Sequence, residues 1–121
     1  MSDLTVDTRD VEDVTVLYPR GFINAHTVRG FDAAIQEAIG RRRFRIVVSC
    51  EDLAYIASAG LGAMMGAIEE IRGSGGDLRL AGLNDTVRNI FEILGFNHLY
   101  RTYTSEAEAV ESVREGGQAA S

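Results

Sequence analysis

The sequence contains only one cysteine and one proline, and it has no long apolar run. The single cysteine, Cys50, cannot form an internal disulfide, which suits a cytoplasmic protein. No apolar run reaches the length of a membrane-spanning helix, so we expect no membrane insertion. The first residues, MSDL, are acidic and lack the basic and then apolar order of a secretory signal. Together these absences predict a cytoplasmic location.

Positive charge is also scarce in this chain. The 12 Lys and Arg residues are outnumbered by 18 Asp and Glu residues, and the net charge of −6 argues against nucleic acid as a direct partner. A length of 121 residues, with 45% apolar and 25% charged residues, suits one globular domain with a single core. We place this domain at residues 1–114 and expect a flexible C-terminal tail at residues 115–121.

The stretch around Ser58 joins a short strand to a helix. The β-branched run at residues 44–50 has strand length, and residues 53–56 predict a second, shorter strand. Ser58 stands just before the helix, where a serine commonly caps free N–H groups and meets the partial positive charge of the helix dipole. Beyond it, apolar residues recur at helical spacing and predict one apolar stripe, made of Leu61, Met64, Met65, Ile68 and Ile71.

Ser58 has two interpretations at this position. In the first, it belongs to a tight strand-to-helix turn and has only a structural role. In the second, its phosphorylation is a switch. A phosphate adds about −1.5 to −2 charges, which a helix N-terminus accommodates but which a partner packed over it would have to desolvate. The neighbours Ala57, Ala59, Gly60 and Gly62 are small and would let the backbone of a partner approach closely.

Alternating and helical patterns predict the remaining elements. Residues 4–7 and 14–18 read as an antiparallel pair, and residues 19–21 should end its second strand. We expect further strands at residues 77–81 and within residues 99–103, and helices that begin near Thr27, near Asn84 or Asp85, and at the capping-box residue Ser105. The apolar residues that should face the core from these helices include Phe31, Ala38, Ile39, Val87, Ile90, Phe91, Leu94, Ala109 and Val113.

Strands that alternate with helices require a mainly parallel central sheet with right-handed crossovers, and the initial hairpin makes the sheet mixed. The sequence therefore predicts an α/β fold with a mixed, mostly parallel sheet of four to five strands and about four helices packed on it. In such sheets the functional edge commonly lies beyond the C-terminal ends of the strands. Asn24, His26 and Ser58 all fall in strand-to-helix turns and are expected on that one edge.

Catalysis has little support in the sequence. His26 and His98 lie in different loops, without a cysteine or carboxylate at a metal-ligand spacing. Ser58 lacks the full glycine-x-serine-x-glycine elbow because Ile56 holds the first glycine position. Cys50 ends an apolar run and should be buried rather than nucleophilic. We therefore predict no catalytic residue, no metal and no cofactor, and a protein that is not an enzyme.

Three adjacent arginines, Arg41 to Arg43, follow Gly40 at the predicted end of the first helix. Cations suit the negative end of a helix dipole, so these side chains can form a solvated face there. The alternative is that they contact an acidic partner or a phosphate.

Residues 55–62, with the sequence YIASAGLG, resemble the signature of STAS domains, especially bacterial anti-sigma-factor antagonists. Two other segments agree: residues 20–24 (RGFIN) resemble the turn before the first helix of the family, and residues 80–96 resemble its late strand-helix unit. The resemblance covers nearly the whole chain in the expected order. It implies a single STAS-like domain.

The resemblance also implies a function in bacterial signalling and transcription regulation. Such a module binds an anti-sigma-factor serine kinase of the ATPase type to release a sigma factor, and phosphorylation of Ser58 by that kinase switches it off. The residues expected to contact the partner are Asn24, His26, Ala57, Ser58, Ala59, Gly60, Leu61, Gly62 and Met65. The oligomeric state stays open between a monomer and a weak dimer.

Three residues depart from the family pattern. Ala57 replaces the aspartate before the phosphorylated serine, Asn24 replaces the aspartate of the earlier loop, and Ala59 replaces a second hydroxyl residue. Such losses are expected where the kinase chemistry is no longer needed. The alternative function is therefore a non-phosphorylated STAS subunit of a signalling assembly or of a lipid-transport complex.

Overall fold

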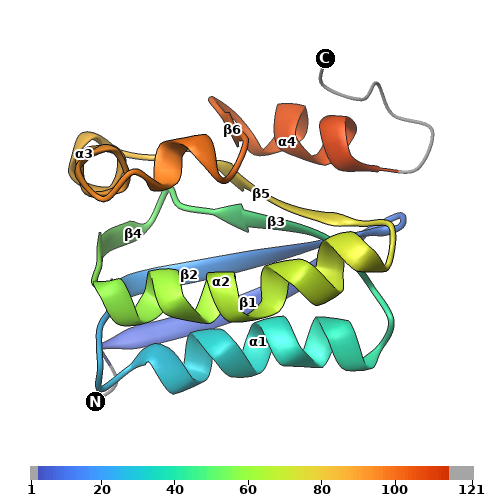
Figure 1. Cartoon of the computed structure of the whole chain (residues 1–121), viewed down its shortest axis with the longest axis horizontal. Helices are drawn as coiled ribbons and strands as arrows, with labels where there is room; N and C mark the ends of the chain where they lie inside the picture. Colours follow the sequence, from blue (N-terminus) through green and yellow to red (C-terminus); the bar gives the residue numbers. More distant parts are fainter. Residues whose placement is uncertain (1–2, 115–121) are drawn as a thin grey trace.

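The computed structural model describes residues 3–114, and the predicted flexible tail at residues 115–121 lies outside the described residues. Helices α1 and α2 lie side by side along the sheet (Figure 1), buried residues of α3 belong to the same core as theirs, and α4 covers the opposite face. The strands are β1 (Leu4–Val11), β2 (Val14–Ile23), β3 (Arg45–Ser49), β4 (Leu53–Ile56), β5 (Asp77–Ala81) and β6 (Thr102–Tyr103). The helices are α1 (Val28–Gly40), α2 (Ser58–Gly73), α3 (Asp85–Ile93) and α4 (Glu106–Val113), with a short 3-10 helix, η1 (Phe96–His98).

The sheet is mixed and mostly parallel, as the order of elements predicts. Its strands follow the order β1-β2-β3-β5-β6, and β4 pairs with β2 beyond the end of β3. The pairing of β1 with β2 is antiparallel, whereas the other four pairings are parallel. The fold class is therefore confirmed, with a sixth strand because the two-residue β6 and the short β4 both join the sheet.

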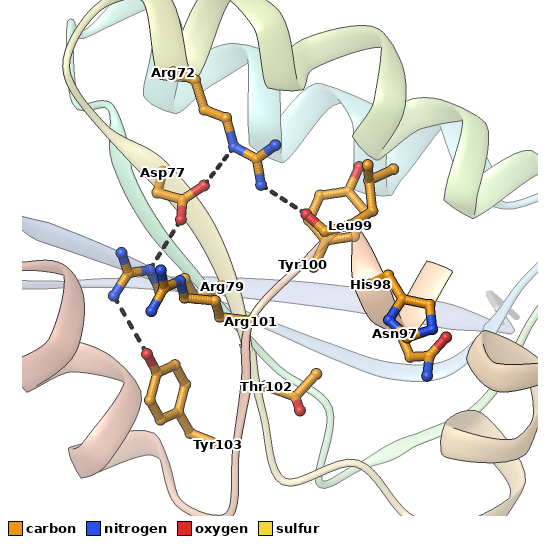
Figure 2. Close-up of a pocket in the computed structure, with 10 residues that line it drawn as sticks. All are labelled: Arg72, Asp77, Arg79, Asn97, His98, Leu99, Tyr100, Arg101, Thr102 and Tyr103. Atoms are coloured by element: carbon orange, nitrogen blue, oxygen red, sulfur yellow. Dashed lines mark hydrogen bonds and ion pairs between the residues drawn. The ribbon is translucent and has the colours of Figure 1, made fainter. Parts of the chain in front are cut away.

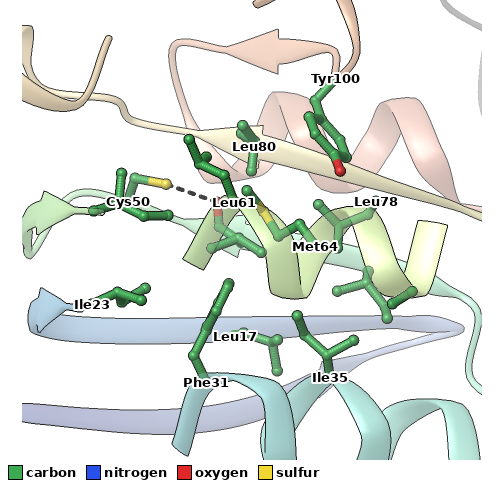
Figure 3. Packing of buried hydrophobic residues seen from close by; sticks show 14 of the residues in the cluster. Leu17, Ile23, Phe31, Ile35, Cys50, Leu61, Met64, Leu78, Leu80 and Tyr100 are labelled. Atoms are coloured by element: carbon green, nitrogen blue, oxygen red, sulfur yellow. Dashed lines mark hydrogen bonds between the residues drawn. The ribbon is translucent and has the colours of Figure 1, made fainter. Parts of the chain in front are cut away.

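The two faces of the sheet carry separate sets of buried side chains because successive residues of a strand point to opposite sides. On one face, Leu17 and Leu78 belong to a core that also contains Phe31 and Ile35 from α1 and Met64 from α2 (Figure 3). On the other face, Ala109 and Val113 of α4 belong to a cluster with residues of three strands: Val14, Val16, Val47 and Ala81. Both faces of the central strands are thus closed off from water.

The prediction that residues 19–21 end the second strand is wrong, because β2 runs on to Ile23. The N–H of Phe22 donates to the carbonyl of Asp3, so by alternation the nitrogen of Pro19 faces away from β1. On that side β2 pairs with β3 at residues 15–17 and with β4 at residues 21–23, and Pro19 falls in the interval between them. The missing N–H of the proline therefore removes no hydrogen bond from either ladder.

The arginines after α1 bind the β1–β2 hairpin. Arg41 Nη1 donates to Asp10 Oδ2 at 2.9 Å, and Arg43 Nε donates to Thr15 Oγ1 at 2.7 Å. The hydrogen bond from Arg41 holds the pKa of Asp10 below its ordinary value. Arg42 instead lies over the ring of Phe44, 5.6 Å from its centroid. Arg41 and Arg43 thus have a structural role, because both bind the β1–β2 hairpin of the same chain.

Two apolar side chains lie outside the core although their spacing predicted otherwise. Met65 is 47% exposed, because Met64, one position earlier on α2, takes the place against the sheet. Leu94 is 48% exposed, because it stands at the C-terminal cap of α3, whose core contacts come from Val87 and Phe91. Cys50 is buried as predicted, and burial raises the pKa of its thiol to about 12.

Candidate functional site

Ser58 is the first residue of α2, and its side chain does not cap the helix. The N-cap position belongs to Ala57, which has extended backbone angles and no side-chain acceptor. The N–H groups of Gly60 and Leu61 point back to the carbonyl of Ala57, at 2.9 and 3.4 Å. The prediction that Ser58 caps α2 is therefore wrong, because the cap position lies one residue earlier, at Ala57. Instead, the side chain of Ser58 is exposed at the N-terminal end of the helix.

Asn24 lies beside this helix start because β2 and β4 are neighbours in the sheet. Ile23 at the end of β2 is in register with Ile56 at the end of β4, and the N–H of Ala57 donates to the carbonyl of Ile23 at 2.8 Å. Asn24 and Ser58 each follow one of these strand ends within two residues. The structure therefore brings their two turns to the same edge of the sheet, together with the exposed His26.

The side chain of Asn24 builds its own turn. Its Oδ1 accepts hydrogen bonds from the N–H groups of His26 at 2.9 Å and Thr27 at 3.2 Å. Thr27 completes the turn, because its hydroxyl donates to the carbonyl of Phe22 at 2.7 Å and accepts from the N–H of Asn24 at 2.9 Å. An aspartate could accept the same bonds, so asparagine keeps the shape of the turn and gives up only its charge.

Two residues predicted as partner contacts, Gly60 and Leu61, are instead buried. A Cβ atom at Gly60 would lie 2.6 Å from Cγ2 of Ile23 and 2.7 Å from Cγ1 of Ile56, so this glycine lets α2 approach the sheet closely. Gly62 differs, since a Cβ there would meet nothing within 4 Å. Of the two glycines, only Gly62 leaves backbone open to a partner.

The sequence patterns missed two aromatic residues next to this edge. Phe22 and Tyr55 are in register on β2 and β4, and they are 48% and 41% exposed. They point to the opposite face from Ile23 and Ile56, beyond the part of the sheet that α4 covers. The exposure of Tyr55 could have been predicted from the sequence, because successive strand residues point to opposite faces and Tyr55 precedes Ile56, which is buried.

A third turn is tied to the same edge through Asn84. Its Oδ1 accepts from the N–H of Val87 at 2.8 Å and so caps α3, which confirms one of the two predicted capping residues. Its Nδ2 donates to the carbonyl of Leu53 on β4 at 2.7 Å. The turn after β5 is thereby fixed to the strand that leads into Ser58.

Comparison with known proteins identifies the family. The profile of the STAS domain matches residues 5–109. The chain belongs to the STAS domain family. It is 26% identical over 109 residues to the anti-sigma F factor antagonist of Paenibacillus polymyxa, with 89% of this chain and 93% of the relative covered. It is 25% identical over 105 residues to the anti-sigma-B factor antagonist of Listeria monocytogenes, with 87% and 91% covered.

Solved structures of STAS proteins show the same fold. The anti-sigma factor antagonist SpoIIAA in its unphosphorylated form superposes with a TM-score of 0.77 at 25% identity, covering 88% of this chain and 94% of that chain. An anti-sigma factor antagonist from Mycobacterium paratuberculosis superposes with a TM-score of 0.83 at 18% identity, covering 93% and 95%.

The side chains at this edge offer the hydroxyls of Ser58 and Thr27, the amide of Asn24 and the imidazole of His26. Among residues 3–114, no three His, Cys, Asp or Glu side chains come together as metal ligands. Over the same residues, no helix is both long and apolar enough to cross a membrane. His26 and His98 are both exposed, and they lie in separate loops. At this edge the side chain of Ser58 is accessible at the first position of α2.

Proposed function

We propose that this STAS domain is an anti-sigma-factor antagonist that binds an anti-sigma-factor serine kinase and is switched off by phosphorylation of Ser58. The observation that carries the proposal is the exposed position of Ser58 as the first residue of α2. The relatives named above are anti-sigma factor antagonists, and SpoIIAA has been solved in both unphosphorylated and phosphorylated forms.

The docking surface that we propose consists of accessible residues only: Asn24, His26, Ala57, Ser58, Ala59, Gly62 and Met65. Ser58, Gly62 and Met65 are spaced by four and then three residues on α2, so they share one exposed face of the helix. Gly62 lets a partner approach the backbone, and the half-exposed Met65 offers an adaptable apolar contact at the end of that face.

A phosphate on Ser58 would have opposite effects on the free chain and on the complex. In the free chain it would stand at the N-terminus of α2, where the helix dipole and free N–H groups favour an anion. In the complex a partner packed over Ser58 would bury the charge, which costs several kcal/mol unless the charge is paired. The fold would therefore persist while the complex dissociates.

A second candidate function is that of a constitutive STAS subunit in a signalling assembly or a lipid-transport complex. The observation that favours it is Ala57, whose methyl group can neither cap α2 nor orient the Ser58 hydroxyl. Under this function the docking surface would bind its partner without any dependence on phosphorylation.

Affinity measurements with a candidate kinase distinguish these functions. We expect wild type and Ser58→Ala to bind equally, and Ser58→Asp to bind about 100-fold more weakly, which corresponds to about 3 kcal/mol. Ser74→Asp is the matched control, because it places the same charge at the exposed C-terminal end of the same helix. Equal affinity of all four proteins would refute the switch.

Intact mass after incubation with ATP and the kinase provides the second measurement. The proposal predicts one added phosphate on wild type and none on Ser58→Ala. Unmodified wild type that still binds the kinase would favour the constitutive subunit.

A further inference from the structure

A polar hollow of about 750 Å³ lies beside β6, at the edge of the sheet (Figure 2). It is formed where the C-terminal end of α2, the strand β5 and the segment that leads into β6 meet. Ser58 stands at the other end of α2, so the hollow is separate from the docking surface. The residues that line it are Arg72, Asp77, Arg79, Asn97, His98, Leu99, Tyr100, Arg101, Thr102 and Tyr103.

The hollow concentrates positive charge on a chain whose net charge is −6. Arg72, Arg79 and Arg101 come from three different segments, and Asp77 is the only carboxylate among the lining residues. The local balance therefore favours cations by two charges, three arginines against one aspartate. Arg72 also lies in the last turn of α2, where its charge offsets the partial negative charge of the helix end.

Asp77 fixes two of these arginines in place. Its Oδ1 accepts from Arg72 Nε and its Oδ2 from Arg79 Nε, each at 2.9 Å, and its Oδ1 also accepts from the N–H of Leu78. Burial alone would raise the pKa of Asp77, but the hydrogen bonds from Arg72 and Arg79 outweigh it and hold this pKa below its ordinary value. The carboxylate is therefore charged at neutral pH and orients both guanidinium groups.

Further contacts hold the same guanidinium groups from the other side. Arg72 Nη2 donates to the carbonyl of Leu99 at 2.7 Å, while Arg79 Nη1 donates to the carbonyl of Ser112 at 2.8 Å. Each guanidinium carries five N–H donors, so these contacts leave donors on both groups. Donors held in a fixed orientation lose little entropy when they bind a ligand.

We propose that this hollow binds a small anion that carries a chain of phosphates. Guanidinium groups match the geometry of phosphate oxygens, and two or three of them can neutralise a di- or triphosphate. The volume lies within the range of small-molecule sites. A protein segment added to the sheet edge fits less well, because β6 offers only two residues for pairing.

Backbone amide spectra of the ¹⁵N-labelled full-length chain, titrated with inorganic tripolyphosphate, test the proposal. We expect saturable shifts confined to the residues that line the hollow, Arg72, Asp77, Arg79 and residues 97–103. Arg101→Gln should weaken binding roughly tenfold, the lower end of the loss expected for one charge-assisted hydrogen bond. Arg29→Gln is the matched control, because Arg29 is an exposed arginine on α1 that does not line the hollow.

Shifts that never saturate, or an equal loss of affinity in Arg29→Gln, would overturn the proposal, because either result indicates non-specific attraction of an anion. If Arg101→Gln unfolds at a lower temperature than wild type, the location of the wild-type shifts decides the question alone. A parallel titration with ATP distinguishes the source of the phosphates. Tighter binding of ATP indicates a nucleotide, and equal or weaker binding indicates that the phosphate chain suffices.

Discussion

Gly60 allows the start of α2 to pack tightly against the sheet, and its replacement by alanine should destabilise the fold. The added Cβ would lie 2.6 Å from Ile23 Cγ2, 2.7 Å from Ile56 Cγ1 and 2.9 Å from Ile56 Cδ1. Both isoleucines are buried, at 0% and 2% exposure, so neither side chain can easily move away. Overpacking of this kind costs about 1–3 kcal/mol, whereas alanine gains about 1 kcal/mol over glycine within a helix.

The net effect that we expect for Gly60→Ala is a loss of up to about 2 kcal/mol in the free energy of unfolding, because the overpacking cost is offset by about 1 kcal/mol of helix propensity. Gly62→Ala is the matched control, because it gains the same helix propensity without any new contact within 4 Å. It should stabilise the chain by roughly 1 kcal/mol. Urea denaturation of both variants measures the difference. Equal stabilisation by the two substitutions would show that α2 tolerates a Cβ at Gly60, which would refute the packing argument.

Three further predictions concern single side chains. Tyr100 is 2% exposed, and its buried hydroxyl has no hydrogen-bond partner among the described residues, so Tyr100→Phe should raise stability by roughly 1 kcal/mol. Thermal unfolding measures this change, and a loss of stability would show that the hydroxyl has a partner. Asp77 has a lowered pKa, so the stability that it contributes is present above the unfolded-state pKa near 3.8 and is lost as the pH falls through the lower folded-state pKa. In Asp77→Asn the free energy of unfolding should therefore fall less as the pH is lowered below about 4 than it does in wild type. An equal fall in both proteins would contradict this reasoning. Ala57→Asn and Ala57→Asp should each add about 1 kcal/mol at pH 7 by capping α2, with a fall in acid for the aspartate alone. If neither substitution stabilises the chain in denaturant unfolding, Ala57 is not the N-cap.

The sequence predicts most elements of this fold because its strands alternate and glycines or capping residues mark many of its turns. Asn84 and Ser105 cap α3 and α4, as their positions in the sequence indicate. Pro19 misled the prediction for a physical reason: a proline interrupts a strand only if its N–H is needed, and that depends on where β3 ends and β4 begins. Such a fact belongs to the sheet and cannot be read from the strand alone.

The candidate site could likewise be predicted from the sequence only in part. The turns of Asn24 and Ser58 could be assigned to one edge from topology, since both follow parallel strands. The position at which α2 begins, between Ala57 and Ser58, could not be predicted. It depends on the hydrogen bond from the Ala57 N–H to the carbonyl of Ile23. The polar hollow was missed entirely, since Arg72 and Arg101 are far apart in the sequence.

The charge of Ser58→Asp should act with opposite sign on stability and on binding. At the first position of α2, which lacks a side-chain cap, an added carboxylate meets the positive end of the helix dipole and should stabilise the chain by about 0.3–1 kcal/mol. Ser74→Asp places the same charge at the negative end of the helix and should destabilise by a similar amount while leaving kinase affinity unchanged. Denaturant unfolding and kinase binding, measured on the same two variants, therefore separate a local electrostatic effect from damage to the fold. If Ser58→Asp lost stability and affinity together, the weaker binding would reflect partial unfolding, and phosphorylation of Ser58 could no longer be understood as a switch that spares the fold.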